Sequence, residues 1–173
     1  MRHVEGDGAL MAHTANSPAP PLRIEATDPQ GPVALALLRE AAIDARALYP
    51  ELHEPDAPWP TNPPLPQRGA YVIAWRGETA IGCGALRPID DDIVEIRRMY
   101  VLRTARKAGV ARAVLVHLEG VARSLGFSIM RLETGYRQQP AMALYESAGF
   151  RRIAPFGEYA NDPTSVCFEK RIS

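Results

Sequence analysis

Apolar and polar residues alternate along three consecutive stretches in the middle of the chain. The stretches are 70–75, 80–86 and 93–101, and each has an apolar residue at every second position or a short apolar run. A period of two places such residues on one face of a β-strand. Arg76-Gly77-Glu78 joins the first two stretches and has the composition of a hairpin turn. The pattern predicts three neighbouring strands of an antiparallel meander.

Three other segments repeat their apolar residues with the period of an α-helix. They are 32–48, 110–125 and 140–148. Proline stands at or near the first position of two of them, at Pro32 and Pro140, where its missing N–H costs nothing. Glycine follows the last two, at Gly126 and Gly149, as is common after a helix. These signals predict three helices.

Four further short strands are expected at 22–26, 128–132, 150–153 and 165–169. The predicted order is β-α-β-β-β-α-β-α-β-β, a mixed α/β fold with no internal repeat. Residues 1–18 show no periodicity and are rich in Ala, Gly, His and Ser, so we expect a disordered tail there. The remaining residues, 19–173, are expected to form one domain.

Residues 50–66 contain seven prolines and form neither a long helix nor a central strand by prediction. Two interpretations of this segment stay open. It is a rigid surface connection, or it is a wall of a substrate site, because it also carries His53, Glu54, Asp56 and Trp59.

The composition narrows the class of protein. With 46% hydrophobic and 23% charged residues among 173, the chain has the composition of an ordinary globular protein. A formal net charge of zero gives no reason to expect a nucleic-acid partner. No run approaches the roughly 20 apolar residues of a membrane span. Cys83 and Cys167 lie far apart without metal-ligand spacing, so we expect two buried reduced thiols, no metal and a cytoplasmic protein.

The stretch Arg106-Lys107-Ala108-Gly109-Val110-Ala111 lies between a predicted strand and a predicted helix. A turn of small residues at a helix start leaves several backbone N–H groups without partners, and the helix dipole adds partial positive charge. Such a turn favours an anion, most naturally a phosphate. The pattern Gly-x-x-x-x-Gly-Lys-Ser/Thr is missing, and Arg87 stands where a dinucleotide fingerprint needs its third glycine, so neither class of nucleotide site is indicated.

The spacing Arg-x-x-Gly-x-Ala of that turn resembles the pyrophosphate loop of the GCN5-related N-acetyltransferases, the GNAT family. A second motif, Ala141-x-x-Leu144-Tyr145-Glu146-x-x-Gly149-Phe150, resembles the other signature of the family at the usual distance. The resemblance is good over 70–172 and loose before that. It implies a twisted, mostly antiparallel sheet flanked by helices, with two central strands splayed apart to admit acetyl-CoA.

The resemblance also implies which residues hold acetyl-CoA. They are Met99, Tyr100, Val101, Arg106, Lys107, Ala108, Gly109, Val110, Ala111, Gln138 and Ala141. Gln138 stands where many relatives have Asn. The implied reaction moves the acetyl group to a primary amine of a small molecule by direct attack in a ternary complex. A protein or peptide acceptor, or a non-catalytic acetyl-CoA sensor, is the alternative, and a homodimer is possible.

Two residues are the candidate catalysts. By its position in the motif, Tyr145 resembles the tyrosine that protonates the departing thiolate, although it also fits a core aromatic. Glu95 is the candidate base, because an amine with a pKa of about 10 arrives protonated. A salt bridge with a neighbouring arginine explains Glu95 equally well. Strict alternation puts Glu95, Arg97, Met99 and Val101 on one face unless a bulge intervenes, and a backbone N–H at or near Val101 is the expected oxyanion donor.

Overall fold

The structure is a computed structural model that describes residues 18–173. The predicted tail lies outside these residues, apart from Pro18. The elements in chain order are β1 Leu22–Ala26, α1 Pro32–Leu48, η1 Pro50–Leu52, β2 Ala70–Arg76, β3 Thr79–Pro88, β4 Ile93–Val101, η2 Arg103–Ala105, α2 Val110–Ser124, β5 Ile129–Gly135, α3 Gln139–Ser147, β6 Arg151–Ile153, η3 Gly157–Tyr159 and β7 Ser165–Arg171. The order of helices and strands predicted from periodicity is confirmed, and every predicted bound lies within three residues of the observed one.

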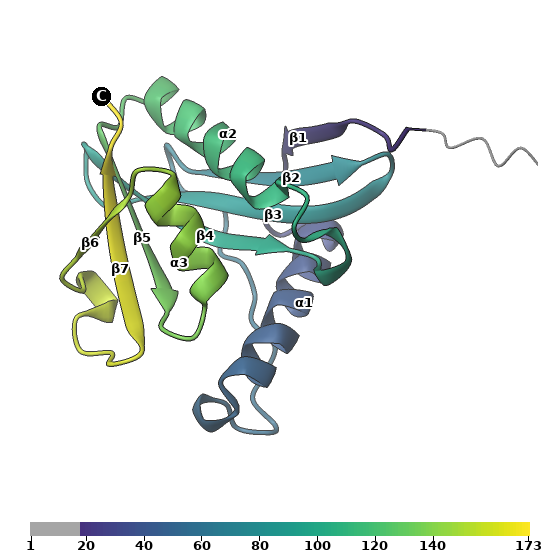
Figure 1. The fold of residues 1–173 in the computed structure, drawn as a ribbon, viewed down its shortest axis with the longest axis horizontal. Coiled ribbons are helices and arrows are strands. Elements are labelled where there is room, and N and C mark those ends of the chain that lie inside the picture. Colours follow the sequence, from purple (N-terminus) through teal and green to yellow (C-terminus); the bar gives the residue numbers. More distant parts are fainter. Residues whose placement is uncertain (1–17) are drawn as a thin grey trace, which may run out of the picture.

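The seven strands form one sheet in the order β1-β2-β3-β4-β5-β7-β6. Every neighbouring pair is antiparallel except β4 and β5, which are parallel. Figure 1 shows that β5, β6 and β7 run steeply across the direction of β1 to β4, so the sheet is strongly twisted. The mixed, mostly antiparallel sheet predicted above is confirmed.

The parallel pair β4–β5 separates part-way along its length. Its register begins at Ile93 opposite Ile129 and ends at Ile96 opposite Leu132. Both strands continue beyond that point, to Val101 and Gly135, without pairing with each other. The expected splay of two central strands is therefore present, and it opens toward the carboxyl ends of β4 and β5.

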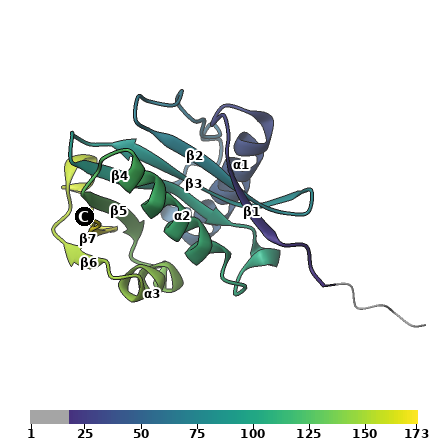
Figure 2. The ribbon, with the colours of Figure 1, turned by 90° about the horizontal axis from the view of Figure 1, so that it is seen from above.

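Helices cover the two faces of the sheet unequally. Figure 2 shows α2 and α3 on one face and α1 on the other. The main core lies under α2 and α3 and includes Val114, Leu118 and Phe168, all fully buried. A smaller core lies under α1, where Leu37 packs against the sheet. Within residues 18–173 no helix is long and apolar enough to cross a membrane.

A β-bulge in β4 changes which side chains share a face. Cys83 of β3 lies opposite Tyr100 and Ala85 lies opposite Arg97, so Gly84 alone faces two residues of β4, Arg98 and Met99. The bulge named above as the exception to strict alternation is therefore present, and Glu95 and Arg97 do not share a face with Met99 and Val101. Met99 and Val101 pack in the core beneath α2, whereas Tyr100 packs on the α1 face, because the extra residue shifts the alternation by one position.

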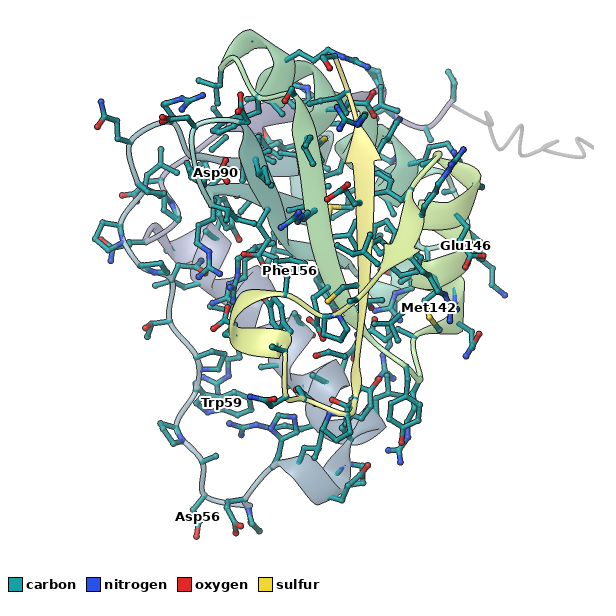
Figure 3. All side chains as sticks on the ribbon, turned by 90° about the vertical axis from the view of Figure 1, so that its left-hand side faces the viewer. Asp56, Trp59, Asp90, Met142, Glu146 and Phe156 are labelled. Atoms are coloured by element: carbon teal, nitrogen blue, oxygen red, sulfur yellow. The ribbon has the colours of Figure 1, made fainter. Side chains whose placement is uncertain are left out.

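The proline-rich segment contains only the short η1 as regular structure, in agreement with the prediction. Arg46 of α1 donates hydrogen bonds to the carbonyl oxygens of Ala57 (2.8 Å) and Pro58 (3.0 Å), and its guanidinium lies 4.0 Å from the ring centre of Trp59. In Figure 3 the segment runs past Trp59 and Asp56 on the same side of the molecule as Phe156, which precedes η3. The segment is thus tied to α1 near its middle, at residues 57–59.

Candidate active site

The turn that precedes α2 presents unpaired backbone donors. Lys107 (φ 60°) and Gly109 (φ 77°) are in the left-handed conformation, and Gly109 is the N-cap of α2 without a side-chain cap. Within the described part of the chain, no backbone N–H from residue 107 to residue 111 donates a hydrogen bond. Free N–H groups at the positive end of a 15-residue helix suit an anion such as a pyrophosphate.

Gly109 is required by its backbone rather than by crowding. A Cβ atom added there meets nothing within 4 Å, whereas its φ of 77° is one that side chains rarely adopt. A larger residue at position 109 therefore strains the turn even where it has room.

Arg106 is held in place by Asp44, a residue that sequence reasoning missed, although its side chain stays 45% exposed. Its guanidinium bonds Asp44 of α1 at 2.6 Å, and its Nε donates to the Val101 carbonyl oxygen at 2.9 Å. Arg103 also pairs with Asp44, at 2.7 Å. Burial raises the pKa of Asp44, but the hydrogen bonds from Arg103 and Arg106 outweigh it and lower the pKa overall. Nothing in the helical pattern of α1 distinguishes Asp44 from its neighbours.

The other predicted cofactor residues lie at the open end of the splay. Because β4 and β5 are parallel, the turns that follow them meet at the same edge of the sheet. Residues 106–111 follow β4, and Gln138, the exposed N-cap of α3, follows β5. Ala141 is half-buried in the first turn of α3. The gap between the strands thus has one predicted cofactor segment on each side.

Tyr145 combines a buried ring with an unengaged hydroxyl. Only 5% of the residue is exposed, and its ring lies 6.0 Å from those of Phe150 and Phe168. Among residues 18–173 the hydroxyl has no hydrogen-bond partner. Burial, and next the charge of Glu133, raise the pKa of Tyr145 to about 12. The hydroxyl therefore keeps its proton at physiological pH. The buried ring fits the interpretation as a core aromatic, and the hydroxyl without a partner among these residues fits the interpretation as a proton donor.

Glu95 lies in a buried ion-pair network. Its side chain is 2% exposed. Arg87 donates to Oε2 through Nη2 (2.6 Å) and Nε (3.1 Å), and the Tyr159 hydroxyl donates to Oε1 at 2.6 Å. Arg97 lies 3.8 Å from Oε2. The salt bridge considered for Glu95 is present, and its role as the base stays a prediction.

Glu133 is a second carboxylate that sequence reasoning did not select. It follows the last residue of β5 that pairs with β4, so it borders the gap. Its only side-chain hydrogen bond among the described residues comes from the Ser165 hydroxyl, at 2.8 Å. Burial raises the pKa of Glu133, and nearby carboxylates, Asp162 and Glu95, raise it further. Leu132 and Thr134 on either side of it are buried, and Glu133 lies on the opposite face of β5. This alternation in the strand was the signal that could have identified Glu133.

Comparison with known proteins agrees with this geometry. The sequence profile of the acetyltransferase (GNAT) family matches residues 36–150. The chain belongs to the GNAT family. An "IAA acetyltransferase" of Azospirillum brasilense is 41% identical over 104 residues, which make up 59% of this chain and 67% of that protein. Both motifs and both splayed strands lie within the GNAT match.

Solved GNAT structures have the same fold. A Klebsiella pneumoniae structure described as an acyl-CoA N-acyltransferase superposes with a TM-score of 0.72 at 29% identity, covering 88% of this chain and 98% of that one. A Bacillus subtilis acetyltransferase in complex with CoA superposes with a TM-score of 0.63 at 21% identity, covering 87% and 99%. The second likeness concerns the fold alone.

The α1 face of this GNAT domain carries two depressions of about 300 Å³ each. One lies over the paired half of β4 and β5, between Glu95, Arg131 and Phe156. The other lies at the end of β4, between Asp44 and Tyr100. Both are on the side of the sheet opposite α2 and α3.

Proposed function

We propose that this GNAT protein transfers the acetyl group of acetyl-CoA to a primary amine of a small molecule by direct attack in a ternary complex. The observation that carries the proposal is the separation of β4 and β5 beyond Ile96 and Leu132. We infer that this gap leads from the phosphate-type turn before α2 to the opposite face of the sheet. Two substrates can therefore meet within it from opposite sides.

Acetyl-CoA fits the turn and the gap. Its pyrophosphate would lie on the free N–H groups of residues 107–111, and Gln138 and Ala141 would border its arm across the gap. Arg106, anchored by Asp44, adds positive charge beside the turn. Acetyl-CoA supplies an activated acetyl group, so that a carbon–nitrogen bond forms while the carbon–sulfur bond breaks.

Tyr145 would protonate the departing sulfur. A phenol whose pKa lies near 12 keeps its proton at neutral pH, and a hydroxyl free of internal partners can donate it. An ordered donor of this kind typically contributes about 100-fold or more to the rate.

The attacking amine must lose a proton to a base near the gap. Glu95 remains one candidate, but its oxygens are bound by Arg87 and Tyr159, so it would act through the Tyr159 hydroxyl or a water. Glu133 is the better placed candidate, because it borders the gap with one hydrogen bond and a raised pKa. A base with a pKa closer to the working pH transfers protons more effectively.

The acceptor would enter from the α1 face, because α2 and the turn occupy the other face. Depressions of about 300 Å³ suit a small molecule, at the lower limit of typical ligand pockets. The proline-rich segment, held by Arg46, would form one wall of this entrance.

The test is a screen for release of the CoA thiol from acetyl-CoA with amino acids, polyamines, aminoglycosides and short peptides. We expect release with a subset of the small amines and a product heavier by one acetyl group. Release only with peptides would indicate a protein acceptor instead. Stoichiometric acetyl-CoA binding without thiol release for any amine would indicate a sensor and would refute the proposal.

A further inference from the structure

Arg98 has an unusual backbone conformation at the edge of the splay. It is the first residue of the β4 bulge and has a φ of 58°, which a long side chain seldom adopts. The thiol of Cys83 donates to its carbonyl oxygen at 3.2 Å and helps to hold the bulge. Backbone strain of this kind persists where the surroundings impose it, and it is concentrated at functional sites.

The guanidinium of Arg98 has no carboxylate partner within residues 18–173. Its Nε donates to Oδ1 of Asn62 at 2.9 Å, and Nη2 makes a long contact of 3.4 Å with the Thr61 carbonyl oxygen. Its neighbour Arg97, by contrast, pairs with Glu158 at 2.7 Å. A guanidinium has five N–H donors, so several of those of Arg98 remain free.

The surroundings of Arg98 oppose its positive charge. Burial and then the like charge of Arg97 lower the pKa of Arg98. A partly buried cation is normally compensated by an acid, and here the nearby polar partners are neutral. An anion brought by a ligand would supply the missing charge.

A buried hydroxyl beside Arg98 is also unsatisfied. Tyr71 of β2 is 2% exposed, and its hydroxyl has no hydrogen-bond partner in the described part of the chain. The Asn62 amide and the Cys83 thiol lie close enough to influence its pKa but not in hydrogen-bonding geometry. Buried polar groups without partners are rare and mark sites of binding or strain.

We propose that Arg98, held by Asn62 beside the buried Tyr71, forms a subsite for a carboxylate of the acceptor through its free guanidinium donors, so that the acceptor is an amino acid or a similar amine that carries a carboxylate. This inference rests on the proposed transfer to an amine. Arg98 lies two residues beyond the last residue of β4 that pairs with β5, and its side chain is on the α1 face. The carboxylate would therefore bind at the entrance through which the amine approaches the gap.

Anchoring of the proline-rich segment is the competing explanation of the Arg98–Asn62 bond. Asn62 is itself buried and donates to the Pro29 carbonyl oxygen at 2.8 Å, so the segment has a second anchor there. Arg46 anchors the same segment at Ala57 and Pro58, away from the bulge. The Arg46→Gln variant therefore tests the effect of a loosened segment while Arg98 is retained.

The experiment compares pairs of acceptors that differ only by the carboxylate: phenylalanine with phenethylamine, tryptophan with tryptamine, and lysine with cadaverine. For each pair, kcat/KM is measured in the wild type and in three variants, Arg98→Gln, Asn62→Asp and Arg46→Gln. The ratio of the two kcat/KM values within a pair is the readout, which cancels general losses of activity. A charge-assisted contact predicts a ratio of about 10 or more in favour of the carboxylate member for at least one pair.

We expect Arg98→Gln to reduce this ratio toward 1. Asn62→Asp should do the same, because it places a carboxylate of the chain against the guanidinium; it keeps the bond from Arg98 and loses only the bond to the Pro29 carbonyl oxygen. Arg46→Gln should keep the wild-type ratio. A ratio near 1 in the wild type, or an unchanged ratio in Arg98→Gln and Asn62→Asp, would overturn the subsite. An equal fall of this ratio in all three variants would show that the proline-rich segment, and not Arg98, distinguishes the two members of a pair.

A failure of the transferase proposal is distinguishable from a failure of the subsite. If no acceptor releases thiol, the same pairs are titrated calorimetrically into the protein saturated with CoA. Binding of the carboxylate member alone, weakened at least tenfold by Arg98→Gln, would support the subsite without the reaction. Equal binding of both members, or binding of neither, would refute it.

Discussion

The Tyr159 hydroxyl donates a 2.6 Å hydrogen bond to Oε1 of Glu95, joining η3 to the buried part of β4 across 64 residues of sequence. Arg87 binds the other carboxylate oxygen, so the burial of Glu95 depends on both partners. Burial, and next the bond to Glu95, raise the pKa of Tyr159, which therefore stays a donor at neutral pH. η3 is thus fastened to the sheet through the carboxylate of Glu95, and also through the ion pairs of Glu158 with Arg87 (2.9 Å) and Arg97 (2.7 Å).

Replacing Tyr159 by Phe should destabilise the domain by about 1–3 kcal/mol, because a buried charged group loses a hydrogen-bond donor. The measurement is the free energy of unfolding in urea. Tyr136→Phe is the matched control, since Tyr136 is 42% exposed and should change stability little. Equal stability of Tyr159→Phe and wild type would show that the bond contributes nothing net.

The two candidate bases differ in their pH dependence. Protonation of the base at low pH produces the acidic limb of the kcat/KM profile, so removal of the true base should abolish that limb. We expect this for Glu133→Gln and an unchanged limb for Glu95→Gln. The reverse result would identify Glu95 as the base. Retention of the acidic limb in both variants would mean that water or another carboxylate is the base.

The pH dependence of stability tests the environment of Glu133 independently of activity. Its pKa is raised in the fold, so its stabilising contribution is greatest below the unfolded pKa and is lost as the pH rises through the folded pKa. Glu133→Gln should therefore unfold at a higher temperature than the wild type at pH 7, with the difference shrinking toward pH 4. A lower melting temperature at pH 7 would contradict the assigned environment.

Gly109→Asp should weaken CoA binding at least tenfold in calorimetry, because it adds a negative charge and strains a residue with a φ of 77°. Gly109→Ala should weaken it less, since a Cβ there meets no atom within 4 Å. Gly120→Ala, in the exposed middle of α2 with open space, is the control and should stabilise the helix by about 0.5–1 kcal/mol. Unchanged affinity of Gly109→Asp would exclude this turn as the phosphate site.

Tyr145→Phe should lower kcat about 100-fold while the ring packing against Phe150 and Phe168 keeps the fold. Since the folded pKa of about 12 exceeds the ordinary value of 10.0, the phenol stabilises the fold fully below pH 10, and this contribution declines toward pH 12. The variant should lack that alkaline decline. A fall in melting temperature at pH 7 in proportion to the lost activity would instead assign Tyr145 to the core alone.

Local patterns in the sequence determined the order of the elements and the turn before α2. Periods of two and 3.6 residues, prolines at helix starts and glycines after helix ends act within a few residues, so they are legible without knowledge of the fold. The turn at Gly109 is predictable for the same reason, because the left-handed conformation at a helix start favours glycine whatever the distant contacts are.

Only the tertiary structure decided the surroundings of the candidate catalytic groups. The partners of Glu95 and Arg106, namely Tyr159 and Asp44, lie 64 and 62 residues away and come from elements of unremarkable pattern. The bulge at Arg98 reversed the expected face of Met99, because strand alternation holds only while the register is unbroken. Burial, charge and pKa depend on these distant contacts, and periodicity within a single element carries no information about them.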